Sequence, residues 1–130
     1  MKISKAKETN EKLSTITAKK LPIKMAFAIQ KNAKKIKEIV DFANERQNDI
    51  IERCAKRDDK GGYVPSEDGQ GIRIADAETF MKEMTELMET DMDIEFVKIS
   101  MADVERCDDE RYDSLTPNDL DAIEDMMIEE

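Results

Sequence analysis

Residues 22–54 read PIKMAFAIQKNAKKIKEIVDFANERQNDIIERC, and this stretch decides the fold. It contains no glycine, and its one proline suits the first position of a helix because no N–H donor is needed there. Apolar residues recur every three or four positions, interrupted only by Gln47, so the stretch predicts one long helix with a buried stripe. The stripe consists of Met25, Ile29, Ala33, Ile36, Val40, Ala43, Ile50 and Cys54.

The predicted helix is long for a chain of this size. About 35 residues of helix span roughly 50 Å, which exceeds the diameter of a compact domain of this length. Part of the helix should therefore project or pack against a partner helix. A second helix capped by Asp76 can run back along it as an antiparallel, coiled-coil-like hairpin. Its apolar stripe consists of Phe80, Met84, Leu87 and Met88.

Shorter elements are predicted around this hairpin. Ser4 can cap a first helix over residues 5–18. Residues 58–75 contain all four glycines and predict a short β-hairpin or loop at the tip of the helical hairpin. Residues 92–99 alternate apolar and polar side chains, which indicates a strand that residues 1–3 can pair with.

The last predicted element is a capped C-terminal helix. Thr116 is the expected cap, Pro117 occupies the first turn and Asp119 follows three residues after the cap. The predicted fold is thus mainly α with a minor β component, in a single domain over residues 1–130. Its parts are a basic helical half at 1–57, the Gly-rich segment at 58–75 and an acidic helix–strand–helix half at 76–130. The buried side of the last helix is expected to hold Leu120, Ile123, Met126 and Met127.

Charge divides the chain more sharply than any motif does. Residues 1–60 carry 16 Lys and Arg against 9 Asp and Glu, whereas residues 61–130 carry 5 against 22. The net charge of −10 makes nucleic acid an unlikely partner, because the acidic half opposes its approach. No apolar run is long enough for a membrane helix, and the first residues do not resemble a signal peptide. We therefore expect a cytoplasmic protein with no membrane partner.

A ladder of lysines surrounds an aromatic ring on the face of the long helix opposite the buried stripe. Ammonium groups beside a ring suit an anionic, nucleotide-like small molecule, because the lysines supply charge and the ring supplies a stacking plane. The alternative is a solvated face that the acidic half of the chain neutralises. The candidate ligand-binding residues are Lys20, Lys24, Phe27, Lys31 and Lys35.

Signals for catalysis are weak. The chain has no histidine, which removes the commonest general base and a common metal ligand. Asp91, Asp93 and Glu95 share one face of the predicted strand and could ligate Mg²⁺ or Ca²⁺, but an exposed, solvated strand face is the better explanation. Cys54 and Cys107 are far apart and should be reduced thiols. We expect no enzyme activity, no metal and no cofactor.

Two short motifs resemble those of a known family. Residues 19–24 read KKLPIK and are followed by AIQKN at 28–32, and residues 115–117 read LTP before LDAIE at 120–124. In these motifs and in the order of its parts, the chain is similar to a family of small uncharacterised phage and prophage proteins of Gram-positive bacteria. The family supplies no catalytic residue to carry over.

From the resemblance and the residues together, we expect a non-catalytic phage-type binding protein that forms a homo-oligomer. We expect it to counter host defence by occupying a host protein or by sequestering an anionic nucleotide-like signal. One alternative is a structural or assembly protein of the virion that uses its helical arm. Another is an acidic mimic of nucleic acid, based on the 12 acids and 2 bases of residues 103–130.

Overall fold

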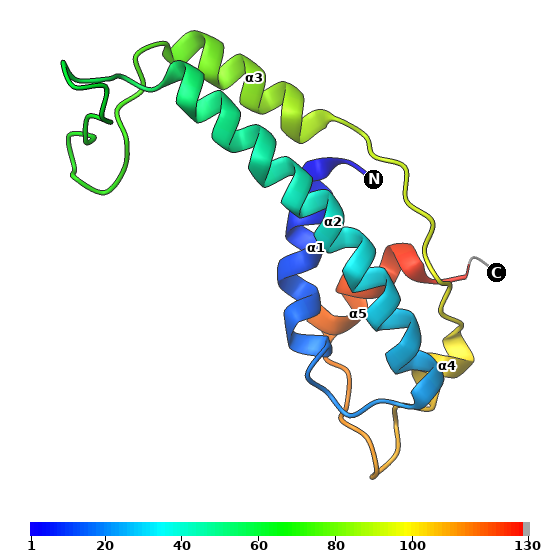
Figure 1. Ribbon diagram of the computed structural model, residues 1–130. Coiled ribbons are helices and arrows are strands. Elements are labelled where there is room, and N and C mark those ends of the chain that lie inside the picture. Colours follow the sequence, from blue (N-terminus) through cyan, green and yellow to red (C-terminus); the bar gives the residue numbers. More distant parts are fainter. Residues whose placement is uncertain (129–130) are drawn as a thin grey trace. The chain divides into compact units, whose positions relative to one another are not determined.

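The structure is a computed structural model that describes residues 1–128 (Figure 1). The chain is mainly helical with one long helix, as the sequence predicts, and the described residues form no sheet. None of the helices in this part of the chain is both long and apolar enough to span a membrane. The elements are α1 (Ile3–Ile16), α2 (Ile23–Cys54), α3 (Ala77–Glu89), α4 (Met101–Glu105), α5 (Pro117–Ile123) and the 3-10 helix η1 (Glu124–Met126).

The chain divides into two compact units. Unit 1 comprises residues 1–40 and 91–130, and unit 2 comprises residues 41–90. The boundary falls inside α2, so each unit contains part of the long helix. The expectation of a single domain stays a prediction.

Unit 1 has an apolar core that also buries polar side chains, Asn32 among them. Ile3, Leu13 and Ile29 are among the fully buried side chains, and α2 adds Asn32, which is 0% exposed. The Asn32 amide donates to the carbonyl of Val97 at 2.9 Å and accepts from the Val97 N–H at 2.7 Å. These two bonds satisfy the backbone carbonyl and N–H of Val97, which lies in an irregular segment, as a neighbouring strand would in a sheet.

Asp119 forms a second buried polar centre, between α1 and α5. Its carboxylate accepts from the Thr15 hydroxyl at 2.8 Å and from the Thr116 N–H at 2.9 Å, and the Lys19 ammonium lies 2.7 Å away. Thr116 and Asp119 form the capping box that the sequence predicts for the start of α5. One carboxylate therefore caps a helix and joins it to α1.

The Asp119 carboxyl should make stability depend on pH in acid. Burial alone would raise its pKa, but the hydrogen bonds from Lys19, Thr116 and Thr15 lower that pKa from 3.8 to about 2. A lowered folded-state pKa stabilises the protein above about pH 4, and this contribution is lost as the pH falls toward about 2. The shift corresponds to ~2 kcal/mol. We expect the difference in free energy of unfolding between wild type and Asp119→Asn to shrink by that amount over this range, measured by urea titration at each pH. A constant difference would contradict the assignment.

Unit 2 contains the second half of α2, a Gly-rich loop and α3. The side chain of Asp76 accepts from the Thr79 N–H at 3.1 Å and caps α3, as predicted. Between the helices, the chain forms isolated bridges rather than strands, with turns at Gly61 and Gly69, whose φ values of 79° and 72° favour glycine. The segment is therefore a loop with bridge pairs, and the predicted strands inside it are not formed.

Three other predictions differ from the structure. The first helix begins at Ile3 rather than after Ser4, because burial of Ile3 decides its start and no side chain caps it. Residues 92–98 form no strand: Asn32 bonds the backbone of Val97, and the N-terminal residues form an isolated bridge between Lys2 and Asp91. Leu120, expected inside, is 44% exposed, because α5 turns Asp119 and Ile123 toward the core.

Candidate functional site

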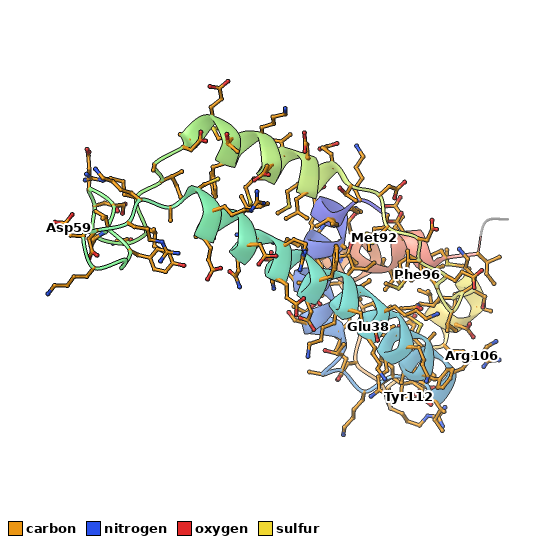
Figure 2. All side chains as sticks on the ribbon, turned by 45° about the horizontal axis from the view of Figure 1, so that its top comes forward. Glu38, Asp59, Met92, Phe96, Arg106 and Tyr112 are labelled. Atoms are coloured by element: carbon orange, nitrogen blue, oxygen red, sulfur yellow. The ribbon has the colours of Figure 1, made fainter. Side chains whose placement is uncertain are left out.

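A cleft of about 510 Å³ opens in unit 1, where α2 begins. Lys24 comes from the first turn of α2, and Arg106, Arg111 and Tyr112 come from the chain that follows α4. Figure 2 shows Arg106 and Tyr112 at this end of the unit. The remaining lining residues are Pro22, Ile23, Asp108 and Asp109.

Hydrogen bonds from backbone and side chains join the two sides of the cleft. The Asp113 N–H donates to the Lys20 carbonyl at 2.9 Å, and the Lys20 N–H donates to the Asp113 carboxylate at 2.7 Å. The Lys19 ammonium also donates to the Ser114 carbonyl at 2.7 Å. Three hydrogen bonds therefore join the turn before α2 to the chain after α4, next to the residues that line the cleft.

Lys24 lies beside a buried carboxylate. Its ammonium is 3.6 Å from Asp103 Oδ1, and its side chain is 71% exposed and extends into solvent. Asp103 forms a capping box with Ser100 at the start of α4. Burial opposes ionisation of Asp103, but the bonds from Ser100 and the charges of Lys24 and Arg106 together lower its pKa. Asp103 is therefore ionised. Its carboxylate attracts the Lys24 ammonium, while most of the Lys24 side chain stays exposed to solvent.

The two arginines of the cleft differ in whether they already form hydrogen bonds or ion pairs. Arg111 donates to both carboxylate oxygens of Asp109, at 3.1 and 3.2 Å, and its guanidinium lies 5.4 Å from the centre of the Tyr112 ring. No described residue forms a hydrogen bond or ion pair with the Arg106 guanidinium, which is exposed. Arg106 is therefore the cleft cation most available to a ligand, since it loses no existing bond on binding.

The rest of the predicted ladder is not gathered in the cleft. Phe27 is 55% exposed, and the Lys31 ammonium lies 5.6 Å from the centre of its ring, one turn further along α2. The Lys35 ammonium donates to the Glu95 carbonyl. Lys20 precedes α2, because the helix begins at Ile23, so the helical ladder starts at Lys24.

Sequence reasoning missed Arg106, Arg111 and Tyr112. The available signal was that residues 103–130 hold only two bases among 12 acids and that both lie close to a tyrosine. These residues face the start of α2 through contacts between residues that are more than 80 positions apart in the chain. A single sequence does not reveal such contacts.

Asp91 is bonded within the chain, and both thiols are buried. Asp91 accepts a hydrogen bond from the amino group of Met1 at 2.6 Å, and residues 1–128 contain no group of three Asp, Glu, Cys or His able to hold a metal ion. Asp58, in the Gly-rich loop, accepts hydrogen bonds from the backbone N–H groups of Lys60 and Gly62. Both cysteines are buried and free, and burial together with the charge of Asp103 raises the pKa of the Cys107 thiol.

No protein-family model matches the chain, and no curated protein or solved structure matches it. The resemblance to phage and prophage proteins therefore stays a prediction.

Proposed function

We propose that the protein is a non-catalytic binding protein that holds an anionic, nucleotide-like ligand in the cleft at the start of α2. The observation that carries this proposal is the convergence of Lys24, Arg106 and Arg111 on one cleft beside the ring of Tyr112. Guanidinium groups match phosphate oxygens in a planar, bidentate geometry, and a ring offers a stacking surface to a base. The negative charge of the ligand would pair mainly with Arg106, and Lys24 would contribute at the rim of the cleft.

Binding without reaction is proposed because the chain has no histidine and because Arg111 already holds one of the two carboxylates of the cleft. The buried Cys107, which does not line the cleft, has a raised pKa. A thiol with a raised pKa is a poor nucleophile near neutral pH. Sequestering a signal of host defence, or occupying a defence protein, is the role that the phage resemblance adds to this proposal.

Binding should fail when the charge of the cleft is reversed. We expect Lys24→Glu combined with Arg106→Glu to weaken binding of ADP at least about tenfold, because each charged hydrogen bond is worth more than ~1 kcal/mol. Isothermal titration calorimetry measures the affinity, and circular dichroism checks that helix content is kept.

A matched control separates the cleft from the overall charge. Lys37→Glu combined with Lys60→Glu makes the same change in net charge at exposed positions outside the cleft. This variant should bind ADP like the wild type. Equal weakening in both double variants, or no binding of ADP or pyrophosphate by the wild type at millimolar concentration, would reject the proposal.

A further inference from the structure

A groove of about 660 Å³ lies within unit 2, between the second half of α2 and α3, which Figure 1 shows side by side. Ile50 and Leu87 are buried at its base, and Phe42 lines it with 43% of its side chain exposed. All its lining residues fall within residues 41–90. The groove is therefore separate from the cleft in unit 1, and its occupant does not depend on the proposed ligand.

Unit 2 buries few side chains for its length. Chains of roughly 50 residues seldom bury enough apolar surface alone, and association is one common remedy. Met84 and Met88 of α3 are only half-buried, and Phe42 faces water. A second surface laid on the groove would remove this apolar area from water. The buried apolar residues of unit 2 are Ala43, Ile50, Cys54, Ala55 and Leu87.

The charges around the groove complement one another across the two helices. Both arginines, Arg46 and Arg53, come from α2, whereas the charged lining residues of α3 are both acids, Glu83 and Glu86. A copy turned by a two-fold axis would present its α3 acids to the α2 cations of the first copy, and the reverse. The two arginines and the two α3 acids can therefore pair reciprocally across a two-fold axis, as an isologous interface requires. The other charged lining residues are Asp49 and Glu52, on α2.

One carboxylate in the groove is incompletely bonded. Arg53 donates to Glu83 Oε1 at 2.8 Å, but no donor among residues 1–128 reaches Glu83 Oε2, although that atom is buried. A buried acceptor without a donor is costly. Arg46 is 52% exposed, and its ion pair with Asp49 is a short-range contact along α2, at 3.2 Å. The Arg46 guanidinium also lies 5.8 Å from the centre of the Phe42 ring, so Arg46 and Phe42 together face the surface that a second copy would meet.

We propose that the groove binds the same groove of a second copy of this chain, forming a two-fold symmetric dimer in which two α2–α3 pairs make a four-helix arrangement. Phe42 of each copy enters the apolar part of the interface, and the arginines of each α2 face the acids of the partner's α3. Because the contact is isologous, assembly closes at two copies.

The first test is the size of the protein in solution. Analytical ultracentrifugation of the full chain should show a dimer for the wild type and a dissociation constant raised at least about thirtyfold for Phe42→Glu, as for an anchor residue at an interface. Met81→Glu is the matched control, because Met81 is a 67% exposed apolar residue of α3 outside the groove. It should remain a dimer. A wild type that is monomeric at about 100 μM, or equal dissociation of both variants, would overturn the proposal.

The second test examines the charge pairing. Arg46→Glu and Glu86→Arg should each weaken the dimer alone, because each places like charges across the interface. Mixed in equal amounts, the two variants should associate, since the altered residues then attract one another between copies. Two variants that stay monomeric when mixed would overturn the arrangement of α2 against the partner's α3.

Discussion

Asp119→Ala should lower the free energy of unfolding of unit 1 by about 3–5 kcal/mol, the usual cost of breaking a buried ion pair by removing one partner. The Asp119 side chain is 1% exposed and holds Lys19, Thr15 and the N-terminal turn of α5. Alanine removes the carboxylate from all three groups at once. It also leaves the ammonium of Lys19, whose side chain is 20% exposed, without this partner. Urea denaturation followed by circular dichroism measures the loss.

Asp121→Ala is the control for Asp119→Ala. Asp121 lies two residues further along α5 and pairs with Lys12, but its side chain is 47% exposed. An exposed pair of this kind contributes less than about 1 kcal/mol. If both variants lost equal stability, net charge rather than the buried network would explain the effect.

Asn32→Ala should lower the free energy of unfolding by about 2–4 kcal/mol, because it leaves a buried N–H and a carbonyl of Val97 unpaired and opens a small cavity. The Asn32 amide makes both bonds, at 2.9 and 2.7 Å, and is fully buried. Amide hydrogen exchange should show faster exchange at Val97, in addition to the loss measured by denaturation.

Asn44→Ala provides the comparison for Asn32→Ala. Asn44 lies on the same helix and is exposed, so alanine there should change stability by less than about 0.5 kcal/mol. An equally small effect at Asn32 would mean that the backbone of Val97 is satisfied in another way.

The local features of the fold were predictable because they depend on neighbouring residues. Thr116 and Asp119 cap α5, Asp76 caps α3, and the spacing of apolar residues from Met25 to Cys54 marks the long helix. Each of these signals is complete within a few residues of the chain. Propensity, capping and periodicity therefore identified the helices.

The features that the sequence did not predict depend on distant contacts. Asn32 lies on the apolar side of α2, where its amide forms hydrogen bonds with the backbone of Val97, 65 positions away. The same contact replaces a strand partner at Val97. In the candidate site, Lys24 was found from helical spacing, whereas Arg106 and Tyr112 reach it only through the fold.

Amide NMR of the full chain titrated with ADP would show whether an anionic ligand binds where α2 begins. We expect chemical-shift changes to concentrate at residues 22–24 and 106–112, with little change at residues 41–90. Lys24→Glu combined with Arg106→Glu should abolish those changes. Changes confined to other parts of the chain, or none at these residues at millimolar ADP, would contradict ligand binding in this cleft.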